Sequence, residues 1–177
     1  VAHGNTDVGI LRDALRLAGI ADEDWRPSIP DAREAIAAFV EAHKADICAN
    51  VLPGVREVLA HLRAKNAILG VATGNLERVG RIKLEQCGLL ECFDFGGFSD
   101  ACEYRRDVFA GAVAKARALM PEPGAIVVVG DTPADVNAAH DNGLEAIAVS
   151  TGIFTAQQLL ASKPEVCVPT LQCLLER

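Results

Sequence analysis

The chain has 177 residues, a length that suits one domain or one domain with a small accessory part. Half of the residues are apolar and 23% are charged, which is typical of a soluble globular protein. The formal net charge of −7 argues against nucleic acid or an anionic membrane as the main partner, and no apolar run is long enough for a transmembrane helix.

Residues 1–50 show helical patterns only. Amphipathic spacing predicts helices over about 7–18 and 31–49, and the link between them contains Trp25. Pro53-Gly54 marks the passage into a second region, where apolar residues at 55, 58, 59 and 62 predict a helix. We therefore predict two parts, a helical segment over 1–50 and an α/β domain over 51–177.

Strand and helix patterns alternate from residue 67 onward. Strands are expected over 67–73, 93–98, 125–129 and 145–150, and helices over 76–86, 107–119, 133–142 and 155–160. Pro169 restricts the last candidate strand, 165–168, to a sheet edge. This alternation predicts a doubly wound parallel sheet with right-handed crossovers.

An acidic motif comes after the most apolar strand. Residues 125–129 predict a strand buried on both faces, and Gly130-Asp131-Thr132-Pro133-Ala134-Asp135 comes directly after it. Open α/β sheets bind ligands at the carboxyl ends of their strands, where Asp131 and Asp135 could share a cation. The alternative is a capping box between Thr132 and Asp135, which needs no metal but leaves Asp131 unexplained.

Two further segments have a possible anion-binding role. Thr73-Gly74-Asn75 combines a hydroxyl, a glycine and the first amides of a helix, although Asn75 could simply cap that helix and Thr73 close the strand. Arg105 and Arg106 precede the helix predicted from residue 107, and one of them could reach a phosphate. Their alternative is a solvated helix start, with Glu103 paired to one of them.

The six cysteines include no Cys-x-x-Cys pair. With only four scattered histidines they do not indicate a zinc site, and we expect them to be reduced in a cytoplasmic protein.

Together these motifs resemble the haloacid dehalogenase-like (HAD) hydrolase superfamily, in its phosphoglycolate-phosphatase-like branch. Gly-Asp-Thr-x-x-Asp after an apolar strand is the specific feature, and Thr73-Gly74-Asn75, the Arg105 region and the helical part before Pro53-Gly54 support it. The resemblance implies a Rossmann-like α/β core over 51–177, lacking its first strand. Residues 1–50 would be part of a helical cap that selects the substrate.

The resemblance also implies roles for individual residues. Asp131 would bind Mg²⁺, with Asp135 supporting the metal site. Thr73 would hydrogen-bond the transferring phosphoryl group, assisted by the amides of Gly74 and Asn75. Arg105, or as second choice Arg106, would neutralise phosphate charge, and Gly4-Asn5-Thr6-Asp7 resembles the cap loop that faces the active site in relatives.

One family motif has no counterpart, the Asp-x-Asp whose first aspartate is the nucleophile and whose second is the general acid and base. Asp22-Glu23-Asp24 has the right letters but comes after no apolar strand. In this fold the missing strand lies between the strands ending at Thr73 and Gly130, so two apolar edges would be unpaired. We therefore expect a longer natural protein with the nucleophile upstream of Val1, or a strand supplied by another chain.

The expected function is that of a Mg²⁺-dependent phosphatase acting on a small phosphorylated metabolite through an aspartyl-phosphate. A non-catalytic binding module, a phosphomutase and a dehalogenase remain alternatives from the same superfamily, and a receiver-like signalling domain fits less well. A dehalogenase would leave the Asp131/Asp135 pair without a use, because it needs no metal. The sequence indicates neither the substrate nor the oligomeric state.

Overall fold

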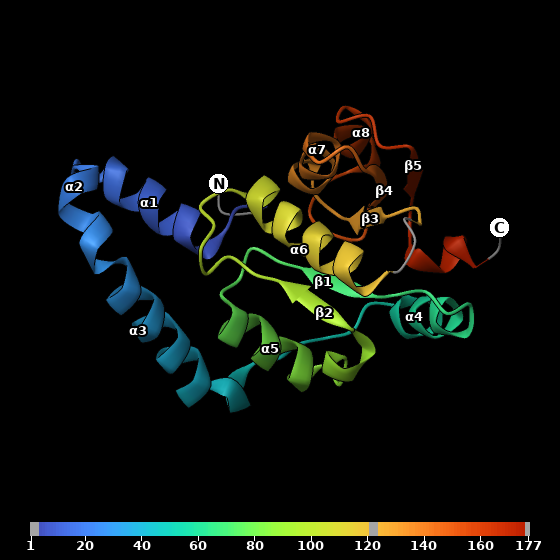
Figure 1. Ribbon diagram of the computed structural model, residues 1–177, viewed down its shortest axis with the longest axis horizontal. Helices are drawn as coiled ribbons and strands as arrows, with labels where there is room; N and C mark the ends of the chain where they lie inside the picture. Colours follow the sequence, from blue (N-terminus) through green and yellow to red (C-terminus); the bar gives the residue numbers. More distant parts are fainter. Residues whose placement is uncertain (1–3, 121–123, 176–177) are drawn as a thin grey trace.

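The computed structural model describes residues 4–120 and 124–175, with two small parallel sheets at its centre (Figure 1). In the first, β1 (Gly70–Ala72) pairs with β2 (Phe95–Gly97). In the second, β4 (Glu145–Val149) lies between β3 (Val127–Gly130) and β5 (Val166–Val168). Among the described residues every strand pairing is parallel and β5 lies at a sheet edge, so the predicted parallel α/β architecture is confirmed.

The helices of the α/β part occur in the predicted order. The predicted helix from residue 107 is wrong at its start, because α6 already includes both arginines at 105 and 106. The elements are α4 (Val55–Ala64), α5 (Glu77–Gln86), α6 (Arg105–Leu119), α7 (Pro133–Asp141) and α8 (Ala156–Leu160), with 3-10 turns η3 (Leu90–Cys92) and η4 (Leu171–Leu174).

The described residues before position 50 contain helices and no strand. They form α1 (Asp7–Leu17), α2 (Asp22–Trp25), η1 (Arg26–Ser28), α3 (Ile29–Ala42) and η2 (Lys44–Asp46). Figure 1 shows α1, α2 and α3 extending to one side of the sheets.

The helix predicted over 31–49 is wrong at both ends. It begins at Ile29, because Pro30 is well tolerated in a first helical turn. It ends at Ala42. The His43 ring stacks on Phe39, and its Nδ1 lies 2.8 Å from the Phe39 carbonyl oxygen, which also accepts from the His43 amide.

Apolar contacts join the helical segment, residues 4–50, to the α/β part. Val8 of α1 and Ala37 of α3 pack with Leu76 and with Val79 of α5 in one buried cluster. A second cluster lies between β4, α7 and α8. A third joins α6 to α7 and is contacted by side chains from both β1 and β3. The helical segment is therefore fastened to α5, while α6 connects the two sheets.

A cavity of about 520 Å³ separates the two sheets, and we call it the slot. It is lined by β1, by β3 and by the face of α6 that carries Phe109 and Val113. Among the described residues, neither β1 nor β3 has a partner on its second edge. Val127 and Val129 border the slot and are 43% and 48% exposed. The prediction of a strand buried on both faces is thus wrong, because the side chains of Val127 and Val129 are left open at the slot, where the described part of the chain supplies no neighbouring strand.

Candidate functional site

Three of the predicted site residues come together at one end of the slot. Arg105, Asp131 and Asp135 all line it, together with Gly130 at the end of β3. Thr73, Gly74 and Asn75 come after β1 but are not part of the slot lining. The structure therefore gathers the two acids and Arg105, and leaves the Thr73 motif beside them, past the end of the neighbouring sheet.

Asp135 is 3% exposed and is neutralised by Arg105, whose Nε donates to Asp135 Oδ1 at 2.6 Å. The other carboxylate oxygen accepts from the Thr132 amide at 3.1 Å and from the Thr132 hydroxyl at 2.8 Å. Thr132 Oγ1 in turn accepts from the Asp135 amide, so the capping-box interpretation of this pair is confirmed. A cation in the first turn of α6 is disfavoured by the helix dipole, and Asp135 offsets that cost for Arg105.

Two glycines leave room for the acids. A Cβ atom on Gly130 would overlap the Asp135 side chain, and a Cβ atom on Gly152 would overlap Asp131 Oδ2. Gly152 lies in the turn after β4, next to the acid that comes after β3. Gly152 was not among the residues predicted from the sequence. The sequence signal for Gly152 is a glycine shortly after a predicted strand, and glycines at such positions commonly have other causes, such as a turn.

The first amides of α5 already have partners within the chain. The Asn75 amide donates to Thr73 Oγ1 at 3.2 Å, and the Leu76 amide donates to Asp7 Oδ2 at 2.9 Å. The Glu77 amide donates to Asp100 Oδ2 at 2.8 Å. The interpretation of Asn75 as the helix cap is wrong, because Leu76 occupies that position and Asp7 supplies the carboxylate. An anion at this helix end would compete with two acids that were not predicted to lie there.

The loop formed by residues 4–7 lies between the two motifs. The Asp7 amide donates to the Gly74 carbonyl at 2.7 Å, and Asn75 Nδ2 donates to Asp7 Oδ1 at 3.2 Å. On its other side, a Cβ atom on Gly4 would lie 2.8 Å from Ala134 Cβ. The loop thus contacts the segments after both β1 and β3.

The remaining charged candidates lie elsewhere. Arg106 lies outside the slot lining, and its Nε is 3.7 Å from Asp107 Oδ1. The alternative in which Glu103 pairs with Arg105 or Arg106 is wrong, because Glu103 binds Arg12 and Arg26 of the helical segment.

Asp22, the first acid of Asp22-Glu23-Asp24, lies in α2 and binds Arg16 and Arg26. The Arg16 guanidinium, with smaller contributions from Arg26 and Trp25, holds the pKa of Asp22 well below its usual range.

Within the described residues, no group of three or more His, Cys, Asp or Glu side chains is arranged to hold a metal ion. The six cysteines are free thiols. In the same part of the chain, every helix is too short or too polar to cross a bilayer.

Comparison with known proteins places these residues in a family context. A family model described as haloacid dehalogenase-like hydrolase matches residues 11–149. The chain is 36% identical over 121 residues to a probable phosphatase, IndB, of Dickeya dadantii, covering 68% of this chain and 52% of that protein. It is 31% identical over 126 residues to a phosphoglycolate phosphatase of Synechococcus elongatus, covering 71% and 58%.

Among solved structures, a hydrolase from Pseudomonas syringae matches with a TM-score of 0.72 at 22% identity, covering 99% of this chain and 78% of that one. This likeness concerns the fold. The chain spans a little over half the length of the two curated relatives.

Proposed function

Because the chain belongs to the haloacid dehalogenase-like hydrolase family, we propose that the protein containing it is a Mg²⁺-dependent phosphatase of small phosphorylated metabolites. The observation that carries the proposal is the joint lining of one slot by Arg105, Asp131 and Asp135. The names of two relatives, a probable phosphatase and a phosphoglycolate phosphatase, point in the same direction. Six free thiols suit the reducing cytoplasm, which is the proposed location.

The donor set at the slot fits Mg²⁺. This ion binds carboxylate oxygens and commonly takes only one or two of them, completing its shell with water and phosphate oxygens. Asp131 would be the direct ligand. Asp135 would support the site from behind, because its two oxygens already accept from Arg105 and Thr132. When bound, the ion would supply Lewis-acid neutralisation of phosphoryl oxygens.

Arg105 and Thr73 would orient the phosphoryl group. Arg105 is held through its Nε contact to Asp135, and the Arg105 side chain is 18% exposed at the slot. Its other guanidinium nitrogens could therefore donate to phosphate oxygens, a geometry for which arginine is well suited. The Thr73 hydroxyl, which accepts from the Asn75 amide, has a proton to donate to the same group.

The slot, with an open strand edge on either side, indicates a position for the nucleophile. An extended strand lying in it would pair with the open edges of β1 and β3, and its carboxyl end would emerge beside Asp131 and Arg105. An aspartate there would attack phosphorus while the ester P–O bond breaks, and a second acid would protonate the leaving alcohol. Water would then attack the aspartyl-phosphate, releasing phosphate and restoring the carboxylate.

The test uses the full-length natural protein and a panel of small phosphate monoesters, with and without Mg²⁺. We expect turnover that chelation abolishes. Outer partners of a metal already cost about 10–100-fold in activity when mutated, so Asp131→Asn should lower turnover by about 100-fold or more. Asp46→Asn, a change at an exposed acid of η2, is the matched control.

Two results would contradict the proposal. Unchanged kinetics in Asp131→Asn would remove the metal assignment. A folded full-length protein without activity on any ester would favour the non-catalytic binding module instead.

A further inference from the structure

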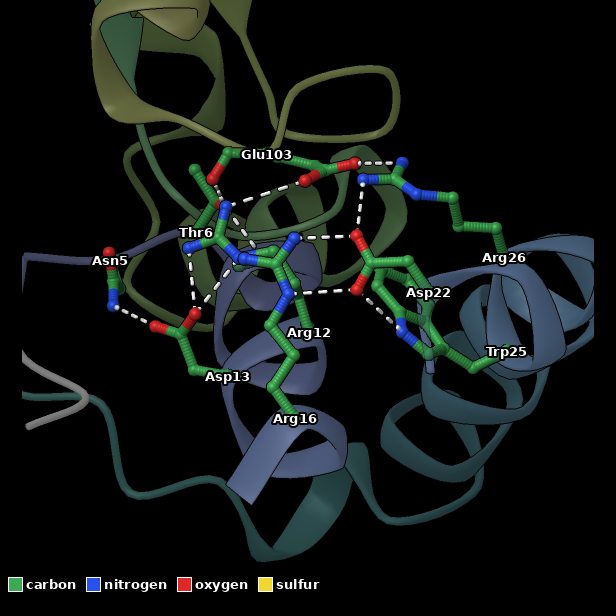
Figure 2. Close-up of polar contacts among 10 residues, drawn as sticks. Asn5, Thr6, Arg12, Asp13, Arg16, Asp22, Trp25, Arg26 and Glu103 are labelled. Carbon is green, nitrogen blue, oxygen red and sulfur yellow. Dashed lines mark hydrogen bonds and ion pairs between the residues drawn. The ribbon is translucent and has the colours of Figure 1, made fainter. Parts of the chain in front are cut away.

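Glu103 connects the helical segment to the loop that leads into α6, as Figure 2 shows. Its Oε1 accepts from Arg26 Nη1 at 2.6 Å, and its Oε2 accepts from Arg12 Nη1 at 3.4 Å. Its backbone carbonyl accepts from Thr6 Oγ1 at 2.8 Å. We call these four residues, Thr6, Arg12, Arg26 and Glu103, the clamp.

The clamp is tightly packed at its centre. Thr6 is completely buried and Arg12 is 6% exposed. Thr6 Oγ1 also accepts from the Gly9 amide at 2.9 Å, which caps α1. A Cβ atom on Gly9 would lie only 2.7 Å from the Glu103 carbonyl oxygen, so the first turn of α1 lies directly against the backbone of residue 103.

The charges of the clamp are mutually satisfied. The buried Arg12 guanidinium has two acidic partners, Asp13 and Glu103, and covers the Tyr104 ring at 4.7 Å. Arg26 bridges Glu103 to Asp22, which also binds Arg16 (Figure 2). A buried guanidinium that loses a partner is costly. The arrangement therefore holds α1, α2 and η1 against one residue of the α/β part.

The two residues after Glu103 link the clamp to the slot. Tyr104 occupies the N-cap position of α6 but makes no side-chain capping hydrogen bond to the described residues of that helix. Its ring is instead covered by the guanidinium groups of Arg12 and Arg106, the latter at 5.3 Å. The next residue is Arg105, which binds Asp135 at the slot. Contacts with the helical segment thus hold the start of α6 in place, where a side-chain cap would otherwise do so.

We propose that Glu103 is a positioning residue that couples the docking of the helical segment to the placement of Arg105 beside Asp135. Displacement of α1 and η1 releases residues 103 and 104, and Arg105 loses its fixed position in the first turn of α6. The proposal rests on the proposed function only in giving Arg105 a phosphate to neutralise. The apolar cluster on α5 is separate from the clamp, so the helical segment stays attached when Glu103 is changed.

The test follows the side-chain Nε–Hε signal of Arg105 by NMR in the full-length protein that contains this chain, without substrate or metal. Arg105→Lys assigns the signal. In Glu103→Gln, one of the two arginine contacts is lost and the other is no longer charge-assisted. We expect exchange of the Arg105 Hε proton with water to become about tenfold faster. Glu57→Gln, at an exposed acid of α4, should leave it unchanged.

A second variant and an internal reference keep the result interpretable. Arg26→Gln changes a side chain that is 46% exposed, so it should fold, and it should shift the exchange in the same direction. Backbone amide exchange in β4 reports the loss of global stability in each variant. The acceleration of Arg105 Hε exchange should exceed the acceleration in β4, which separates positioning from general destabilisation.

Unchanged Arg105 Hε exchange in Glu103→Gln would overturn the coupling. Because no turnover is measured, an inactive protein with coupled Arg105 would contradict the proposed function but leave this inference standing.

Discussion

The same substitution, glycine to alanine, should have opposite effects at two helical positions. Alanine is intrinsically better in a helix than glycine by about 0.8–1.0 kcal/mol. At Gly111, inside α6, an added Cβ meets no neighbouring atom of the described residues within 4 Å. Gly111→Ala should therefore raise the free energy of unfolding by about 1 kcal/mol.

At Gly9 the added methyl group has no space. It would lie 2.7 Å from the Glu103 carbonyl oxygen and 2.8 Å from Thr6 Oγ1, so either α1 or the loop that leads into α6 has to move. That movement weakens two contacts of Thr6, its cap of α1 and its bond to Glu103, each worth about 1 kcal/mol. After the intrinsic gain is subtracted, Gly9→Ala should be destabilised by about 1 kcal/mol, and overpacking would add to this.

Urea titration of both variants measures the difference, which should be about 2 kcal/mol between them. The slope of unfolding free energy with denaturant has to match the parent, so that only stability is compared. A Gly9→Ala protein as stable as Gly111→Ala would refute the close approach of α1 to residue 103, and with it the geometry of the clamp.

Two further predictions concern the site and the clamp. Gly152→Ala places a methyl group against Asp131 Oδ2, so it should weaken activation by Mg²⁺ by about tenfold in a Mg²⁺ titration. Gly111→Ala is the control and should be activated like the parent. Equal activation of Gly152→Ala and the parent would mean that Asp131 binds no metal there. For Glu103, hydrogen bonds from Arg26 and then Arg12 lower the pKa below its usual 4.5. The charged carboxylate thus contributes stability above that pH, which is lost as the pH falls through the lowered value. The stability difference between the parent and Glu103→Gln should be constant from about pH 7 to 5 and shrink below; a difference that grows in acid would contradict this sign.

Local signals predicted local structure well. The pattern after residue 125 placed a strand, a turn and a helix, and the structure has β3, the acids and α7 in that order. The capping box between Thr132 and Asp135 spans three residues and depends on little else. Errors fell at helix ends, where α3 begins two residues before the predicted start and ends at Ala42, and where α6 already includes Arg105 and Arg106.

Contacts between distant residues were beyond such reasoning. Asp7 bonds the Leu76 amide across 69 positions, and Thr6 bonds the Glu103 carbonyl across 97. Nothing in the neighbourhood of Asp7 marks it as the partner of a helix that begins so far away. Tertiary structure alone makes Asp7, and not Asn75, the carboxylate at the start of α5. It likewise makes Arg12 and Arg26, and not Arg105 or Arg106, the partners of Glu103.

The slot depends both on local strand patterns and on contacts between distant residues. Alternating patterns predict strands but do not state which edges meet, whereas the described residues of β1 and β3 each leave one edge open on opposite sides of a cavity. Exposed valines on β3 are unfavourable because apolar surface is left in water, and the open edge of the strand in addition promotes aggregation. We therefore propose the slot as the place of a strand, and the same strand would deliver a carboxylate to Arg105 and Asp131. Stability and catalysis would then both depend on this strand. A protein that is folded but inactive would therefore be an informative result, because folding would indicate that the strand is in place.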